Sequence, residues 1–79
     1  MIEQLSETYP DLTKSQKKLA TYVTENIDRV LLFNSHDLAR QAGVSEATVS
    51  RFVRRLGFAS YLEFKRNLIR STLDSYSTT

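Results

Sequence analysis

The stretch from Ser35 to Gly57 constrains the fold of this chain more than any other feature, because it has the pattern of two short helices joined by a tight turn. Gly43 lies where the backbone must reverse, and a residue without Cβ adopts a positive φ at no steric cost. Val44 fills the turn, and Ser45 is placed to cap the next helix by accepting a backbone N–H. Two short amphipathic helices around a three-residue turn that contains glycine are typical of a helix-turn-helix.

The apolar residues on both sides of the turn support this interpretation. They recur at helical spacing, three in the first helix and four in the second, and Gly57 is expected to end the second helix. These apolar positions are Leu38, Ala39, Ala42, Val49, Phe52, Val53 and Leu56. We predict that they face the core, with the second helix spanning residues 46–56.

The opposite face of the helix at 46–56 changes character along its length. Ala47 and Ser50 make its first part slim, Arg51 and Arg54 follow, and Thr48 and Arg55 lie on the flanks. A recognition helix needs small residues close to the base edges and arginines that reach guanine or phosphate. The helix would be about 16 Å long, enough to cross a major groove. Three arginines alone favour an ordinary solvated face, but after a helix-turn-helix turn they favour DNA binding.

Composition limits what else the chain could do. Its 79 residues, 41% of them hydrophobic, provide one modest core and no room for a buried catalytic cavity. The absence of cysteine excludes a disulfide, a thiol nucleophile and a cysteine-ligated metal, in keeping with a reducing cytoplasm. No apolar run is long enough to cross a membrane, and the N-terminus lacks a signal-peptide pattern. We therefore expect a soluble cytoplasmic protein without a membrane partner.

The distribution of charge is more informative than the net charge of +2. Residues 35–70 contain seven Lys or Arg and three acidic residues, whereas residues 1–34 contain four bases and five acids. The positive charge therefore lies in the predicted helix-turn-helix and in the helix that follows it. This distribution favours an anionic partner for that part of the chain.

Helix signals before the helix-turn-helix are clear. We expect a short helix over residues 2–8, ended by Pro10 because a residue before proline is pushed out of the α region. Thr13 and Gln16 then form a capping box that opens a helix running to about Asn26. A further short helix is predicted from Asp28.

Lys14, Lys17 and Lys18 lie in the first turns of the helix that Thr13 opens, where the helix dipole disfavours positive charge. Two interpretations stay open. The lysines form a solvated face, or an anion such as a DNA phosphate compensates for the misplaced charge.

The helix-turn-helix itself is expected to begin with Ser35 as its cap. His36 follows in the first turn, without a second residue at metal-ligand spacing, and we interpret it as an exposed polar residue. We expect no metal and no cofactor.

After Gly57, Ser60 and Glu63 form a second capping box. The helix that they open carries four residues at core spacing, namely Tyr61, Phe64, Leu68 and Ile69. We predict one helix-turn-helix domain over residues 1–73 and a flexible tail, or the start of a linker, over residues 74–79. The fold class is all-α with five or six helices, of homeodomain-like type and without a wing.

Three segments resemble the N-terminal domain of RpiR-family bacterial transcription regulators: LTKSQKKLATYVTEN, AGVSEATVSRFVRRLGF and SYLEFK. The resemblance covers about Ile2 to Leu73. LacI-type regulators carry a very similar AGVS-x-x-TVSR run, but there it lies almost at the start of the chain. Here about 34 residues of helix precede it and GF-x-x-Y-x-EFK follows, as in the RpiR group.

The resemblance implies a regulator of sugar-metabolism genes that binds a double-stranded DNA operator. It also implies a C-terminal SIS domain, absent from this chain, that binds a phosphosugar effector, and a homodimer in the full-length protein. The DNA-contacting positions of the family correspond to Ser45, Glu46, Ala47, Thr48, Ser50 and Arg51. From their charge and position we add Arg54, Arg55, Lys17 and Lys18.

Two other classes of function compete with DNA binding. A helical protein-interaction module could keep this fold, but it should present acidic or large apolar residues on the exposed face, where Ala47, Ser50 and Arg51 stand. Glu46 suits either function. An enzyme is disfavoured, because one histidine, no cysteine and no carboxylate pair leave nothing from which to build a catalytic site.

Overall fold

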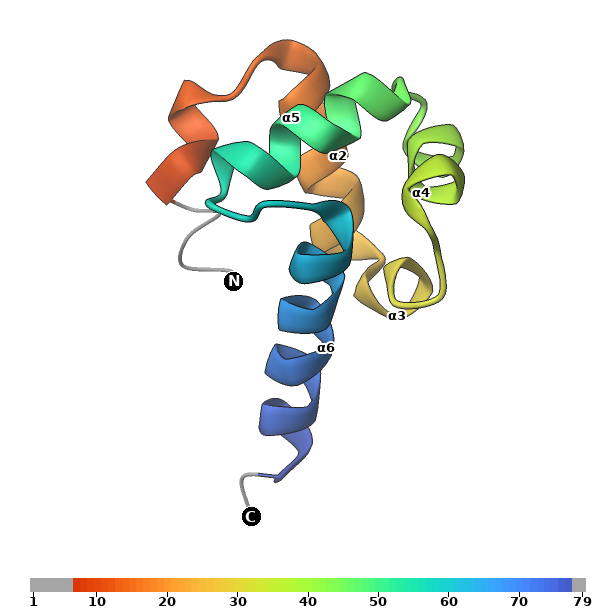
Figure 1. Cartoon of the computed structure of the whole chain (residues 1–79), viewed down its shortest axis with the longest axis vertical. Helices are drawn as coiled ribbons and strands as arrows, with labels where there is room; N and C mark the ends of the chain where they lie inside the picture. The colour runs from red at the N-terminus through yellow and green to blue at the C-terminus, as the bar shows by residue number, and fades with distance from the viewer. Residues whose placement is uncertain (1–6, 78–79) are drawn as a thin grey trace.

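The computed structural model describes residues 7–77, and every regular element within that range is helical (Figure 1). The helix predicted over residues 2–8 lies almost wholly outside this range. The described elements are a short 3-10 helix η1 (Tyr9–Asp11) and the α-helices α2 (Lys14–Glu25), α3 (Ile27–Val30), α4 (Ser35–Ala42), α5 (Glu46–Arg55) and α6 (Tyr61–Ser77). The prediction of an all-α fold with five or six helices is confirmed.

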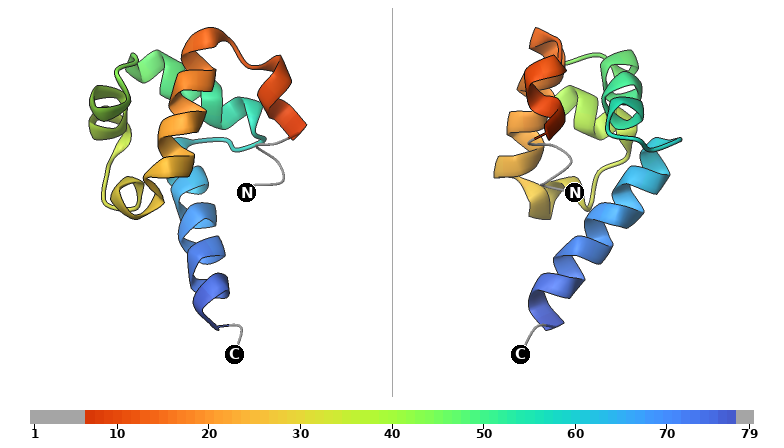
Figure 2. Two further views of the ribbon diagram at one scale, coloured as in Figure 1. Left: turned by 180° about the vertical axis from the view of Figure 1, so that it is seen from behind. Right: turned by 90° about the vertical axis from the view of Figure 1, so that its left-hand side faces the viewer.

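The core lies where α5 packs against α2, α4 and α6 (Figures 1 and 2). Leu19 of α2, Leu38 of α4, Phe52 of α5 and Phe64 of α6 are all fully buried. The rings of Phe52 and Phe64 meet edge to face, with their centroids 6.0 Å apart and their planes at 74°. An edge-to-face pair adds to the stability that comes from burying the two rings. The apolar spacing in the helix-turn-helix therefore identified its core-facing side correctly.

Both predicted capping boxes are recognisable in the structure. At the start of α2, Thr13 Oγ1 accepts from the Gln16 N–H at 3.2 Å and Gln16 Oε1 accepts from the Thr13 N–H at 3.1 Å. At the start of α6, Ser60 Oγ accepts from the Glu63 N–H at 3.3 Å. The Glu63 carboxylate, however, accepts from the N–H of Ala59, one residue earlier than a capping box requires. The first box is confirmed in full and the second only in part.

The start of α4 differs from the prediction by one residue. Asn34, with an extended backbone, is the N-cap, and its Oδ1 accepts from the Asp37 N–H at 2.8 Å. Ser35 is already the first helical residue. Asparagine and serine cap helices about equally well, so two adjacent cap residues leave the boundary undetermined from sequence. The short helix α3 likewise begins at Ile27, one residue before the predicted Asp28.

Two further expectations were wrong. Pro10 lies inside η1, because the first residues of a helical turn need no N–H donor and so accept proline. Ile69 is 38% exposed, although we predicted it to be in the core. The helix that carries it, α6, continues to Ser77. The C-terminal part of α6 extends away from the other helices (Figures 1 and 2), and its apolar residues Ile69 and Leu73 are exposed.

Tyr61 connects α6 to the start of the helix-turn-helix. Its hydroxyl donates to the carbonyl oxygen of Phe33 at 2.8 Å, just before the cap of α4. Burial, with a smaller effect of the Asp37 carboxylate, raises the pKa of Tyr61 to about 12. The phenol therefore keeps its proton and its hydrogen bond at neutral pH.

Candidate nucleic-acid interface

The turn between α4 and α5 has the geometry that its glycine predicts. Gly43 has φ 74° and ψ 35°, the left-handed conformation of a helix C-cap. Its N–H donates to the Arg40 carbonyl at 3.2 Å, and the Val44 N–H donates to the Ala39 carbonyl at 2.9 Å. These bonds satisfy carbonyls that the end of α4 would otherwise leave unpaired. The predicted positive φ at Gly43 is confirmed.

Ser45 caps α5 as expected, and this fixes where the helix begins. Ser45 Oγ accepts from the Thr48 N–H at 3.1 Å. Ser45 Oγ also forms a hydrogen bond with Thr48 Oγ1 at 3.0 Å, in which either hydroxyl can be the donor. Both residues were predicted as DNA contacts on the strength of the resemblance. In the structure each already has a local partner that holds the first turn of α5 in place.

The faces of α5 are divided as the sequence predicts. Val49, Phe52 and Val53 are buried. The residues on the other side are exposed, namely Glu46, Ala47, Ser50, Arg51, Arg54 and Arg55. Thr48 is half-buried. The structure thus brings the predicted recognition residues together on one solvent-facing surface, small at its N-terminal end and basic at its C-terminal end.

The end of α5 comes one residue earlier than predicted. Its last helical residue is Arg55, Leu56 is the C-cap, and Gly57 has φ 97°. Arg54 and Arg55 therefore lie in the last turn, where positive charge interacts favourably with the helix dipole. The dipole alone accounts for part of the preference for arginine at these positions.

Arg55 also makes a long-range contact that the sequence did not reveal. Its Nη2 donates to the carbonyl oxygen of Asp11 at 3.1 Å, across 44 residues of sequence. This bond ties the end of α5 to η1. Any contact between Arg55 and DNA would compete with it.

The first turns of α2 and the turn at Gly43 enclose an open hollow of about 500 Å³. Among the described residues no carboxylate contributes to its lining, which consists of Tyr9, Lys14, Ser15, Lys17, Lys18, Thr21, Gly43 and Val44. Three ammonium groups, with no acid among the lining residues that the structure describes, make this hollow a candidate site for an anion. The lysines identified in the sequence thus lie beside the helix-turn-helix turn. Local sequence patterns could not predict this proximity, because the two segments are far apart in the chain.

Two contacts position these lysines. Lys17 Nζ lies 5.4 Å from the centroid of the Tyr9 ring, within the range of a cation–π interaction. Lys18 Nζ lies against Gly43, where an added Cβ would stand only 3.0 Å from it. The glycine therefore serves the turn twice, through its positive φ and through the room that it leaves for an ammonium group.

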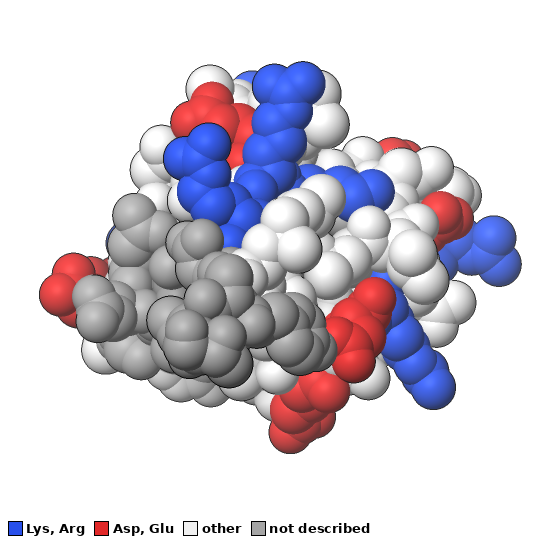
Figure 3. All heavy atoms as spheres, turned by 90° about the horizontal axis from the view of Figure 1, so that it is seen from below, with Lys and Arg blue, Asp and Glu red and all other residues white. Residues whose placement is uncertain are grey.

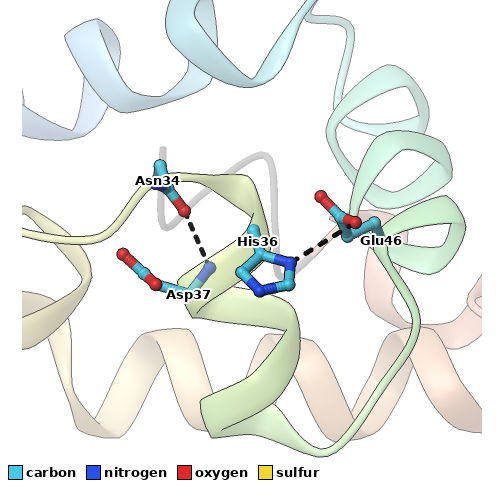
Figure 4. A network of polar contacts seen from close by, with 4 residues as sticks. All are labelled: Asn34, His36, Asp37 and Glu46. Carbon is cyan, nitrogen blue, oxygen red and sulfur yellow. Dashed lines mark hydrogen bonds and ion pairs between the residues drawn. The ribbon is translucent and has the colours of Figure 1, made fainter.

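His36 and Glu46 form a contact between the two helices of the helix-turn-helix (Figure 4). His36 Nδ1 lies 3.5 Å from Glu46 Oε2, and the two side chains are 58% and 60% exposed. The prediction that His36 is exposed is confirmed, but its partner was missed. Ten residues separate the two in sequence, and only the sharp turn brings them together.

The surface charge is unevenly distributed. Viewed from the free end of α6, basic side chains gather most densely in one region, while acidic side chains are scattered (Figure 3). No group of three or more His, Cys, Asp or Glu residues that could hold a metal ion occurs in the described part of the chain. None of its helices is long and apolar enough to span a bilayer.

Fold and surface together define a helix-turn-helix domain of DNA-binding type. Comparison with known proteins agrees: the profile of the "Helix-turn-helix domain, rpiR family" matches residues 1–75. The chain belongs to this family of bacterial DNA-binding transcription regulators.

Individual relatives are longer than this chain. An uncharacterised HTH-type transcriptional regulator of Clostridium perfringens is 32% identical over 78 residues, which are 99% of this chain and 28% of the relative. The HTH-type transcriptional regulator HexR of Pseudomonas aeruginosa is 35% identical over 71 residues, 90% of this chain and 25% of HexR. A third, uncharacterised HTH-type regulator from Thermotoga maritima is 33% identical over 72 residues, 90% of this chain and 26% of that regulator. The chain spans about a quarter of the length of these relatives.

Proposed function

We propose that this domain binds a double-stranded DNA operator in a sequence-specific manner, with α5 in the major groove. One observation carries the proposal: a capped turn presents an exposed helix face that is small at its N-terminal end and basic at its C-terminal end. Small side chains let the helix approach the base edges, and arginines bind guanine or phosphate.

The exposed residues of α5 are assigned different roles by their position. Glu46, Ala47, Ser50 and Arg51 lie in the first part of the helix, which enters the groove in most helix-turn-helix complexes, and we assign them to base contacts. Arg54 lies one turn further on and is assigned to phosphate. Arg55 is assigned a weaker phosphate role, because its guanidinium is already bonded to Asp11.

We assign phosphate contacts outside α5 to the hollow lined by Lys14, Lys17 and Lys18, which we call the lysine hollow. Lys17 and Lys18 lie beside the turn that precedes α5, so the DNA strand next to the recognition helix would pass close to them. Phosphate contacts fix the register of a protein on DNA without reading sequence. The lysine hollow would thus orient α5 in the groove.

The regulatory setting follows from the family resemblance. We propose that the full-length protein is a cytoplasmic homodimer that regulates genes of sugar or phosphosugar metabolism. A phosphosugar effector would bind a C-terminal SIS domain outside this chain, and residues 74–79 would lead into the linker. The length of the relatives, about four times that of the matched segment, is in keeping with such an arrangement.

Selection of binding sites from random double-stranded DNA tests the proposal. We expect the chain to enrich one sequence and to shift that sequence in a gel. Arg51→Ala should bind the selected site more weakly and with relaxed base preference. Enrichment of no sequence, with the fold intact, would favour the alternative of a helical protein-interaction module.

The isolated domain should bind DNA weakly and ignore sugar phosphates. One module buries only about 600–1,000 Å² of protein surface on DNA, whereas tight operator binding usually needs two modules on half-sites about 34 Å apart or a multiple of that. Joining two copies should therefore raise the affinity sharply. Calorimetric titration with phosphorylated sugars should give no heat of binding, and saturable one-to-one binding would place an effector site within residues 1–79.

A further inference from the structure

The contact between His36 and Glu46 joins the two helix N-termini of the helix-turn-helix. His36 is the second residue of α4, and Glu46 is the first residue of α5. Glu46 therefore stands at the end of the recognition helix that would meet the base edges, and His36 reaches it from the neighbouring helix at 3.5 Å.

The close-up shows that His36 is directed at Glu46 and not at the acidic residue beside it. The ring of His36 faces α5, whereas the carboxylate of Asp37 lies on the other side of α4 (Figure 4). The N–H of Asp37 is held by Asn34, which fixes the first turn of α4 and so the base from which His36 projects.

This contact contributes little to folding. Both side chains are more than half exposed, and exposed ion pairs are typically close to neutral in their effect on stability. An imidazole can nevertheless present an N–H at Nδ1 in either charge state, as one tautomer of the neutral ring or as the cation. It can therefore orient a carboxylate oxygen whether or not it is protonated.

On DNA, a carboxylate at the start of α5 faces two opposing effects. The phosphates repel it, while in the major groove a carboxylate can accept a hydrogen bond from cytosine N4. A neighbouring imidazole that donates from Nδ1 limits the directions in which the carboxylate points. Because His36 Nδ1 lies on the side of Oε2, at 3.5 Å, Oε1 is the carboxylate oxygen that we assign to a base.

We propose that His36 is a positioning residue for Glu46, and that the pair determines a preference for cytosine at the base pair beneath the first turn of α5. This inference rests on the proposed DNA binding and deepens it by naming what sets the specificity at one position. His36 acts through Glu46 and not as a base contact in its own right.

A double-mutant cycle on the selected binding site tests the inference. We expect Glu46→Gln to reduce discrimination at one base pair by at least about five-fold, since a good base contact is worth that much or more. His36→Ala should reduce discrimination at the same base pair and weaken binding about two- to five-fold, the range of an exposed ion pair. In the Glu46→Gln background, His36→Ala should have no further effect. His36→Gln, which keeps an N–H donor, should restore part of the preference.

Matched controls separate this inference from the proposed function. Gln41→Ala changes another exposed residue of α4 and should leave the base preference unaltered. Circular dichroism should show the same helix content for all variants. If the unmodified chain selects a sequence but His36→Ala keeps the full preference, or if the two substitutions act additively, the inference is overturned and DNA binding stands. If the unmodified chain selects no sequence, the proposed function itself fails.

Discussion

The two faces of α5, a helix of ten residues, differ in burial and in residue type. The face that includes Val49, Phe52 and Val53 is buried in the core. The face that includes Ala47, Ser50 and Arg51 is exposed to solvent. One face is specified by packing, and the other is exposed to solvent.

Because of this difference, we expect substitutions on the two faces to affect stability and DNA binding separately. A substitution on the buried face changes the free energy of unfolding and affects DNA binding only through the fold. A substitution on the exposed face leaves stability within about 0.5 kcal/mol and changes binding directly. The turn at Gly43 belongs to neither face, since it both joins the core helices and aims the exposed side.

Phe52→Ala should show the largest effect, on stability. It removes a fully buried ring that packs edge to face on Phe64, and such truncations cost about 3–5 kcal/mol. Chemical denaturation monitored by circular dichroism measures this loss, with the exposed Ser50→Ala as the control on the same helix. A Phe52→Ala protein that melts like its parent yet fails to bind DNA would show that the two faces are assigned the wrong way round.

Arg51→Ala is the counterpart on the exposed face. Its guanidinium projects from the middle of the proposed groove-facing surface, so its loss should cost about 1–3 kcal/mol of binding free energy and relax the preference at one base pair. The melting curve should stay unchanged. Site selection with the variant measures both parts, and an unaltered base preference would remove Arg51 from the base contacts.

Much of this arrangement could be predicted from local sequence patterns. Helical spacing identified the buried face of α5, and glycine chemistry identified the positive φ of Gly43, because both depend on residues close together in the chain. Boundaries were less certain where two residues could cap equally well, as at Asn34 and Ser35. Ile69 was misplaced because periodicity shows that a residue shares a face, and not whether another helix covers that face.

Contacts between distant segments could not be predicted in this way. Three such contacts join parts of the chain that only the fold brings together. They are the hydrogen bond from Arg55 to Asp11, the hydrogen bond from Tyr61 to Phe33 before α4, and the approach of Lys18 to Gly43. The same holds for His36 and Glu46. These contacts hold α5 and the turn before it in place, so local sequence patterns predicted which face of α5 is exposed better than they predicted the contacts that support it.

Gly43→Val should affect both faces at once. A β-branched residue at φ 74° is strained by at least ~1 kcal/mol, and its Cβ would meet Lys18 Nζ at 3.0 Å. We expect a lower melting temperature together with weaker DNA binding, because α5 would be re-aimed. Gly43→Asn is the matched control, since asparagine tolerates this conformation better than valine. Equal losses for the two variants would show that the backbone conformation is not what limits the turn.

The smallest expected effect comes from substitutions in the lysine hollow. Unlike the exposed face of α5, this surface is proposed to bind DNA without reading its sequence. Lys17→Ala together with Lys18→Ala removes two of the three ammonium groups that line it. If each contacts a phosphate, the dependence of log affinity on log salt should become shallower by about one per contact, because fewer counterions are released. Binding to all DNA sequences should be weakened alike, in contrast to the effect of Arg51→Ala, since phosphate contacts carry no base information.

Arg29→Ala is a control for the loss of one positive charge, because Arg29 is exposed and absent from the hollow. An unchanged salt slope in the double variant would identify the lysines as a solvated face, and the charge against the dipole of α2 would then be an uncompensated cost to that helix.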